Sequence, residues 1–355
     1  MRALFYTPLF LLLSFSLSAQ TADHVAPFDS TYVFQIIKDQ PEPVRAIFDW
    51  VAREMDYDLA SLENLPTYSH PSELLDSIWM NRRGVCMHYA ELMNAFCQKA
   101  GYESVVVNGY TVSPRTVDRR YGHSWNAVKV KGKWQLYDPT WAAGYRQGKR
   151  FVKKYDHRWY AVAPRNFIRT HVPFDPVWQL LEQPVNSQKV RVKTAPALAF
   201  ADIIEQDKQL DVIAKDRAQL ARIRAFADDN PLVLREVERI QNNIEIQIFK
   251  RGVANYNASI DMFNGFISNY NRGFGRSNWS DEKLQKMAQQ INTRLQTAEV
   301  HFLDLDPENP IYRESLADNL QLMQTYKRRV KALNGFVYRY LKTWRIFRWL
   351  VRLEG

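Results

Sequence analysis

The chain has 355 residues, of which 46% are hydrophobic and 24% charged, and its formal net charge is +10 at neutral pH. This length and apolar content suffice for two domains of ordinary size, and the sequence holds no internal repeat, which excludes a repeat architecture. The last 30 residues hold nine lysines and arginines against one acidic residue, so the basic balance belongs mostly to the C-terminal tail.

The N-terminal residues have the pattern of a secretory signal peptide. A basic start at Arg2 precedes an apolar run of about 15 residues, which ends at the small pair Ser18–Ala19. The run is shorter than the roughly 20 apolar residues of a membrane span. We therefore expect a signal peptide over residues 1–19, a mature chain that starts near Gln20, and a periplasmic or secreted protein. An uncleaved N-terminal anchor is the alternative.

Three helices are predicted in the next segment of the chain. Apolar residues recur at helical spacing from Pro41 to Asp58, and a second, short helix is expected over Ser72–Met80. The third helix is expected over Val85–Ala100, where Gly101 is a typical C-terminal breaker.

The chain holds two cysteines, and both fall within this third predicted helix. Cys86 and Cys97 are 11 residues apart, or about 16 Å along a helix, whereas a disulfide needs Cα atoms within about 7 Å. We expect Cys86 to be a free thiol. Cys97 lies on the apolar stripe of the helix and is expected in the core.

Strands follow the helices. They are predicted at Ser104–Val112, Ser124–Val130 and Lys133–Tyr137, and the last two are joined by a hairpin turn at Lys131–Gly132. Helices followed by strands favour an α+β fold in which helices pack on an antiparallel sheet. We place this domain at residues 20–185.

The rest of the chain is predicted to be helical. Prolines recur between Pro164 and Pro196 and indicate an extended segment, within which residues 186–196 are assigned as a linker. From Ala197 onward four or five helices are expected, interrupted at Asp228–Pro231, at a Gly/Asn/Ser cluster over Asn269–Ser280 and again at Asp304–Pro310. This helical domain covers residues 197–355.

The helical domain ends in a basic amphipathic segment. Over Leu333–Leu353, Trp344 and Phe347 fall on one side with other apolar residues, while Arg345 and Arg348 lie mostly elsewhere. Such a helix lies on an anionic membrane surface or forms the last helix of a bundle with its cations solvated. The bundle is favoured and membrane-surface contact stays open.

Three residues carry the chemistry that the sequence suggests. Cys86 follows Gly84 and Val85 at the start of the third helix, where the helix dipole and free backbone N–H groups favour a thiolate. Gly84 would allow a tight entry into this turn, and the Cys86 N–H group would donate to an oxyanion. Taken alone, a cysteine at such a position is more often a small buried hydrophobe.

The predicted hairpin brings the other two residues together. If Val130 pairs with Lys133, Trp125 faces Asp138, and His123 and Asp138 are diagonal neighbours on one face of the sheet. Asp138 would then bond one imidazole nitrogen of His123 and leave the other for Cys86. A slip of one residue in this register would break the arrangement.

These motifs resemble the transglutaminase-like superfamily. The GVC-x-x-YA run, the HSWNAV strand and the W-x-L-Y-D-P-T-W strand occur in the family's order between Pro41 and Gly144. The DPTWAAGY and PRNFIRTHVPFDPVWQLL segments look more like its kyphoscoliosis-peptidase-like branch than like the animal cross-linking enzymes, so the chain resembles a bacterial member close to that branch. The resemblance implies a papain-like fold, a triad of Cys86, His123 and Asp138, and acyl transfer through a thioester on Cys86.

The family also places an upstream side chain in the oxyanion hole, and the sequence does not choose among Trp50, Tyr57 and Tyr68. His88 is expected to be a surface or structural residue, and His171 a structural one. The other histidines share no ligand spacing with one another or with the cysteines, so no metal and no cofactor is expected.

We therefore expect an exported cysteine peptidase, amidase or acyltransferase that acts on a protein or peptide substrate, with hydrolysis favoured over cross-linking. A non-catalytic envelope scaffold that retains the fold is the alternative, and the helical domain and basic tail keep it open. Nucleic acid is not expected as a partner, because the chain carries an export signal.

Overall fold

The computed structural model describes residues 28–62, 64, 68, 70–113, 116–185, 199–226, 228–273 and 279–353. The predicted signal peptide (1–19) and the predicted linker (186–196) lie outside the described residues, so both stay predictions. The chain divides into two compact units. The first comprises the chain up to Asn108 together with His123–Phe167, and the second comprises Gly109–Gly122 together with Ile168–Gly355.

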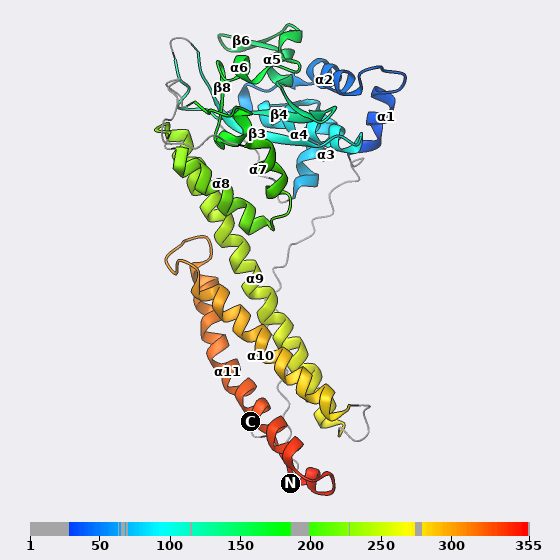
Figure 1. The fold of residues 1–355 in the computed structure, drawn as a ribbon, viewed down its shortest axis with the longest axis vertical. Coiled ribbons are helices and arrows are strands. Elements are labelled where there is room, and N and C mark those ends of the chain that lie inside the picture. Colours follow the sequence, from blue (N-terminus) through cyan, green and yellow to red (C-terminus); the bar gives the residue numbers. More distant parts are fainter. Residues whose placement is uncertain are drawn as a thin grey trace. The chain divides into compact units, whose positions relative to one another are not determined.

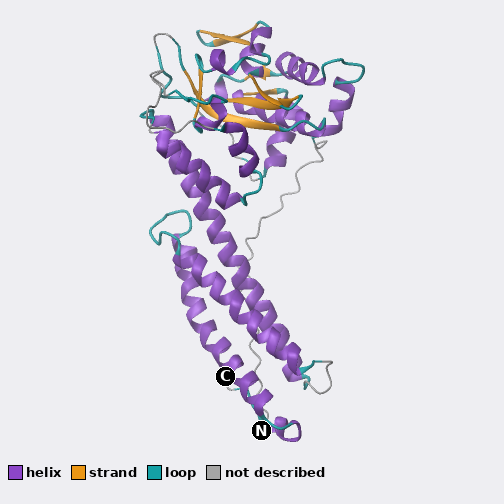
Figure 2. Ribbon diagram, viewed as in Figure 1, coloured by secondary structure: helices purple, strands orange, loops and turns teal. Residues whose placement is uncertain are grey.

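The first unit combines short strands with helices that mostly precede them in the chain (Figures 1 and 2). Its helices are η1 (Ser30–Tyr32), α1 (Val33–Ile36), α2 (Pro43–Glu54), η2 (Ala60–Leu62), α3 (Pro71–Asn81), α4 (Cys86–Lys99), α5 (Pro139–Ala143), η3 (His157–Trp159) and α6 (Pro164–Phe167). Its strands are β1 (Asp56–Tyr57), β2 (Arg83–Gly84), β3 (Ser104–Thr111, whose last residues belong to the second unit), β4 (His123–Val130), β5 (Lys133–Tyr137), β6 (Gly144–Gln147) and β7 (Arg150–Lys153).

The main sheet has the strand order β5-β4-β3-β8, where β8 (His171–Pro173) belongs to the second unit. β4 and β5 are antiparallel, with Val130 opposite Lys133 and Asn126 opposite Tyr137. Lys131 and Gly132 both have positive φ, 49° and 77°, which two-residue hairpin turns of this kind require. The predicted hairpin is confirmed, and so is its register from Val130–Lys133 to Asn126–Tyr137.

The core of the first unit lies between α2, α4 and the sheet. Ile47, Phe48 and Val51 recur on one face of α2 and are fully buried, together with Leu92 and Phe96 of α4. This spacing is why both segments form amphipathic helices, and their apolar faces close over the strands. The predicted α+β class is confirmed.

The second unit is mainly helical. Its elements after β8 are η4 (Pro176–Gln179), α7 (Phe200–Asp207), α8 (Val212–Phe226), α9 (Pro231–Asn271), α10 (Asp281–Leu303), α11 (Arg313–Lys342) and η6 (Arg345–Leu350). Asn230 caps α9 by accepting from the Leu232 N–H, and Pro231 occupies the first helical position, which explains the predicted interruption. The 41 residues of α9 extend over about 60 Å.

Three long helices, α9, α10 and α11, lie side by side in this unit (Figure 1). Apolar residues such as Ile248, Ile291 and Met323 are buried between them. Nearer the start of α9, Arg222 of α8 forms ion pairs of 2.7 Å with both Asp175 and Asp207. None of the described helices is both long enough and apolar enough to cross a membrane.

The predicted C-terminal helix is shorter than expected. Leu333, Phe336 and Val337 are buried in the bundle, as the favoured bundle arrangement requires. α11 ends at Lys342, however, and Thr343 has an extended ψ of 137°. The residues after α11 lie beside the first residue of α10, Asp281, so little of the α10 surface remains for them to pack on. The prediction that Trp344 and Phe347 face the bundle interior is wrong, because both are exposed.

Candidate active site

Cys86 is the first residue of α4, and its position is fixed by a short parallel strand pair. Tyr57 of β1 lies opposite Gly84 of β2, and the Asp58 N–H donates to the Gly84 carbonyl at 2.9 Å. Val85, the residue before the helix, has no side-chain acceptor, and the positive end of the helix dipole lies at the thiol. Cys86 is 8% exposed, and both cysteines are unbridged as predicted.

Gly84 is required for a different reason from the one expected. A Cβ atom at this position would lie 2.4 Å from Cγ of His88, so the imidazole packs directly on the glycine backbone. His88 Nδ1 accepts from the Val85 N–H at 3.1 Å, and its Nε2 lies 3.2 Å from the Tyr68 hydroxyl. His88 is therefore a buried structural residue that holds the entry into α4, and not a surface residue.

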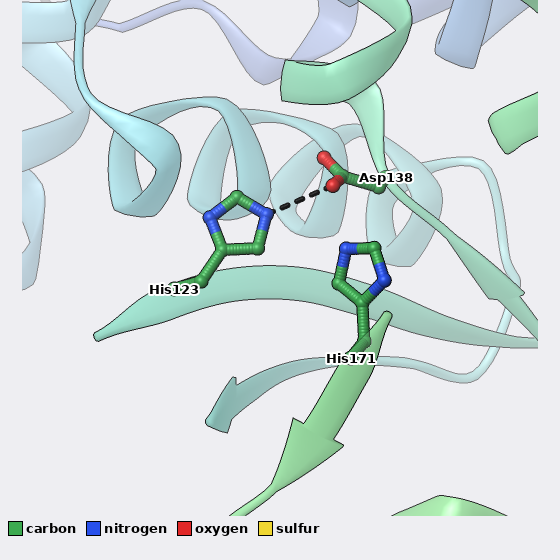
Figure 3. A group of neighbouring side chains, drawn as sticks. All are labelled: His123, Asp138 and His171. Carbon is green, nitrogen blue, oxygen red and sulfur yellow. Dashed lines mark hydrogen bonds and ion pairs between the residues drawn. The ribbon is translucent and has the colours of Figure 1, made fainter. Parts of the chain in front are cut away.

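His123 and Asp138 face one another across the end of the hairpin (Figure 3). His123 is the first residue of β4, and its Nε2 lies 2.8 Å from Oδ2 of Asp138. The Asp138 carboxylate is fully buried, so it accepts this hydrogen bond in a low-dielectric environment. Histidine and aspartate side chains can bind metal ions, but here His123 Nε2 and Asp138 Oδ2 are hydrogen-bonded to each other.

Asp138 has a second role that the sequence reasoning did not include. The β4–β5 ladder ends at the Asn126–Tyr137 pair, and Asp138 is the N-cap of α5 instead of a strand residue opposite Trp125. Its Oδ1 accepts from the backbone N–H groups of Thr140 and Trp141 at 2.9 and 3.0 Å. The signal was available, because Asp followed by Pro is a typical helix start.

Cys86 completes the set. The imidazole of His123 hydrogen-bonds the Cys86 side chain, and since Nε2 is engaged by Asp138, Nδ1 is the nitrogen left for sulfur. The backbone N–H of Ser124 also donates to the sulfur. The structure thus brings together the three residues predicted from the sequence, from the start of α4, the start of β4 and the end of β5.

The charges in this group favour an ion pair. Burial opposes ionisation of Cys86, but the hydrogen bond from His123 and its charge lower the pKa of the thiol below its usual value. Burial would also lower the pKa of His123, yet the negative charge and hydrogen bond of Asp138, with help from Cys86, raise that pKa to about 10. A thiolate facing an imidazolium is the activated form of a cysteine nucleophile.

Tyr57 is the residue that lies at the Cys86 backbone. The Cys86 N–H donates to the Tyr57 hydroxyl, whereas Tyr68 contacts His88 and Trp50 stacks on Trp79. Burial, together with the negative charges of Cys86 and Asp138, raises the pKa of Tyr57 well above its usual value, so the hydroxyl keeps its proton. Of the three residues left open, Tyr57 is the one beside the nucleophile.

Other side chains hold the group in place. Asn126, buried in β4, donates from Nδ2 to the Ala90 carbonyl of α4 at 2.9 Å and so fastens the strand to the helix. Sequence reasoning missed it, although a polar residue at an inward position of an apolar strand was a usable signal. Trp125 is fully buried beside His123, where it packs against the imidazole, and the Trp141 ring lies 5.7 Å from the imidazole.

Comparison with known proteins finds a transglutaminase-like region in part of the chain. Residues 31–139 match the family model of the transglutaminase-like superfamily. The first unit contains a transglutaminase-like domain. The superfamily assignment made from the sequence motifs is therefore confirmed, and cysteine-based catalysis is the chemistry that this assignment suggests.

Two relatives support the predicted branch. Kyphoscoliosis peptidase of Homo sapiens is 30% identical over 151 residues, which cover 40% of this chain and 22% of the relative. Hillarin of Drosophila melanogaster is 29% identical over 168 residues, 41% of this chain and 19% of the relative. The chain thus spans about a fifth of the length of these relatives. A crystal structure of a TGase aligns with 36% of this chain and 35% of its own, at 17% identity and a TM-score of 0.26.

Proposed function

We propose that the transglutaminase-like domain is a cysteine enzyme that cleaves amide or peptide bonds in a protein or peptide substrate. The observation that carries the proposal is the hydrogen-bonded chain from Asp138 through His123 to Cys86. Its geometry fits a nucleophile, a base and an orienting carboxylate, and the match of the surrounding domain to the superfamily raises the expectation of this chemistry.

The reaction would proceed in two halves. The Cys86 thiolate attacks the carbonyl carbon, a C–S bond forms, and the carbonyl oxygen becomes an oxyanion. His123 gives its proton to the departing nitrogen as the C–N bond breaks, which leaves a thioester on Cys86. Water then gives a proton to His123 as it attacks the thioester, and the acid is released with restoration of the thiolate–imidazolium pair.

Tyr57 and the Cys86 N–H are proposed to bind the oxyanion. In the resting site these two groups hydrogen-bond each other, and the tyrosine keeps its proton because its pKa is raised. An oxyanion lying between them would accept from both. Tyr57→Phe should lower kcat by about 10- to 100-fold with little change in KM, because a transition-state donor acts on kcat. An unchanged kcat would remove Tyr57 from the mechanism.

Hydrolysis is favoured over cross-linking in this proposal because one of the relatives, kyphoscoliosis peptidase of Homo sapiens, is named a peptidase. The test is mass spectrometry of the intact protein after incubation with envelope extract, with and without glycine ethyl ester. An acyl adduct on Cys86 and release of free acids support hydrolysis, whereas capture of the amine as an amide supports transfer. Cys97→Ala is the matched control, since Cys97 is buried away from the site and should leave the adduct unchanged.

A non-catalytic scaffold is the second candidate. The observation in its favour is that Cys86 and His123 are each only 8% exposed, which restricts access of a large substrate in this conformation. The Cys86→Ala variant distinguishes the two functions in cells. If the protein is an enzyme, cells with this variant should show the phenotype of a deletion, and if it is a scaffold, they should behave as cells with the unchanged protein.

Export of the chain is part of the proposal and rests on the N-terminal pattern of Arg2, the apolar run and Ser18–Ala19. N-terminal sequencing of the mature protein from a periplasmic fraction should find a start near Gln20. A chain that retains Met1 in the cytoplasmic fraction would contradict export.

A further inference from the structure

The C-terminal end of the second unit displays a dense run of apolar side chains to solvent. Residues 344–350, which we call the C-terminal tip, consist of Trp344 and the short helix η6. Five of these seven residues are exposed large hydrophobics: Trp344, Ile346, Phe347, Trp349 and Leu350. Trp344 is 78% exposed and Trp349 is 67% exposed. Contiguous exposed apolar side chains of this kind mark an interaction surface, whereas scattered single ones do not.

The C-terminal tip is fastened to the bundle in this arrangement. Arg348, the least exposed residue of the tip, forms two hydrogen bonds to Asp281 at the start of α10, at 2.6 and 2.9 Å. Its Nε also donates to the Thr343 carbonyl at 3.1 Å, and beyond the tip the Leu353 N–H donates to the Tyr270 hydroxyl of α9 at 3.2 Å. The apolar side chains are therefore presented outward from an anchored segment.

Cations surround the apolar side chains. Lys342, Arg345 and Arg352 are exposed on and around the tip, while Asp281, the acid at its base, is already bonded to Arg348. Arg339, Lys342 and Arg352 line one hollow of about 600 Å³ beside Leu350. Guanidinium and ammonium side chains beside one hollow are suited to bind phosphate oxygens.

We propose that the C-terminal tip binds the surface of an anionic phospholipid bilayer. Trp344 and Trp349 enter the interfacial region, where indole rings are preferred, while Lys342 and Arg345 contact lipid phosphates. Charge complementarity decides for this partner, because a second copy of the tip would bring like charges together. From the sequence, the C-terminal segment was either the last helix of a bundle or a membrane-surface helix. In this proposal α11 is the bundle helix and the residues after it contact the membrane. This proposal is independent of the catalytic one.

The test is co-sedimentation of the full chain with lipid vesicles. Vesicles of phosphatidylglycerol and phosphatidylcholine in equal parts should bind the protein, and vesicles of phosphatidylcholine alone should bind it more weakly. Brominated lipids in the anionic vesicles should quench tryptophan fluorescence. Trp344→Ser with Trp349→Ser should weaken binding at least about tenfold, since two large apolar side chains are lost from the interface.

A charge variant tests the second half of the proposal. Lys342→Glu and Arg345→Glu should each weaken binding to anionic vesicles by about fivefold or more, the contribution of one cation near an anionic surface. Matched controls lie elsewhere on the bundle. Val300→Ser with Leu303→Ser removes two equally exposed apolar residues of α10, and Lys250→Glu reverses an exposed cation of α9.

Tip variants that bind anionic vesicles as the unchanged chain does would overturn the proposal. So would controls that weaken binding as much as the tip variants do. A tip-dependent dimer in light scattering, without vesicle binding, would show that a second copy is the partner. Circular dichroism establishes that each variant is folded, and the single change Arg345→Glu, at an exposed residue, provides the test if the double tryptophan variant does not fold.

Discussion

The reactivity of Cys86 towards iodoacetamide as a function of pH tests the ion pair most directly. His123 is protonated across neutral pH because its pKa is raised to about 10, and its charge lowers the pKa of the Cys86 thiol. The alkylation rate of Cys86 should therefore exceed that of an ordinary thiol at pH 6 and rise less steeply from about pH 6 to pH 9.

The size of the effect follows from the fraction of thiolate. An ordinary thiol with a pKa of about 8.5 is only about 0.3% ionised at pH 6, and burial raises the pKa of Cys86 further once His123→Ala removes its partner. The larger thiolate fraction of Cys86 is partly offset by the weaker nucleophilicity of a low-pKa thiolate. We expect His123→Ala to slow labelling at pH 6 by at least about tenfold.

Cys97 is the control within the same chain. It is fully buried, and burial raises its pKa to about 12, so it should stay unlabelled in the native protein at every pH tested below this value. Peptide mapping by mass spectrometry assigns the label. A Cys86 rate that follows an ordinary thiol titration and does not respond to His123→Ala would refute the ion pair.

Three further changes address the architecture around the site and in the second unit. Asp138→Asn and Asp138→Ala should both lower Cys86 labelling at pH 6, but the alanine variant should lose about 1 kcal/mol more unfolding free energy because only asparagine still caps α5. Gly84→Ala should lower the unfolding free energy by about 1–3 kcal/mol through its clash with His88, whereas Gly265→Ala, with nothing near its Cβ, should raise it by up to about 1 kcal/mol. Arg222→Met should cost about 3–5 kcal/mol, because two facing carboxylates lose their cation.

Denaturant unfolding measures these stabilities. Equal stability of the two Asp138 variants would contradict the capping role, and a stabilising Gly84→Ala would contradict the close packing of His88. For Arg222→Met, the loss should shrink in acid, because burial raises the pKa of Asp175 and its protonation removes the buried charge. A loss that does not depend on pH would mean that packing and not charge accounts for the effect.

The sequence predicted the hairpin and the three site residues because these depend on local patterns. Lys131–Gly132 fixes the turn, and strand alternation then fixes which residues share a face with His123. The choice of Tyr57 could not be made in the same way. It depends on a two-residue parallel pair, β1 with β2, whose partners are 27 residues apart and have no periodicity to detect.

The end of α11 was also beyond local reasoning. The helical pattern of apolar residues continues through Trp344 to Val351. The expected break over Asn269–Ser280 agrees with the end of α9 at Asn271 and the start of α10 at Asp281, but it does not show which part of the last helix lies beside it. Helix length in a bundle is set by the surface available for packing as well as by propensity. The predicted helix was too long because the apolar pattern continues past Lys342, where α11 ends.

The two hydrogen-bonding roles of the Asp138 carboxylate determine what a misfolded hairpin would lose. One carboxylate both starts α5 and orients His123. A hairpin that closed one residue out of register would place another residue at the helix start, so α5 would lose its cap together with the imidazole contact. Misassembly here should therefore produce a destabilised chain that quality control can recognise, and not a stable but inactive protein that accumulates unnoticed.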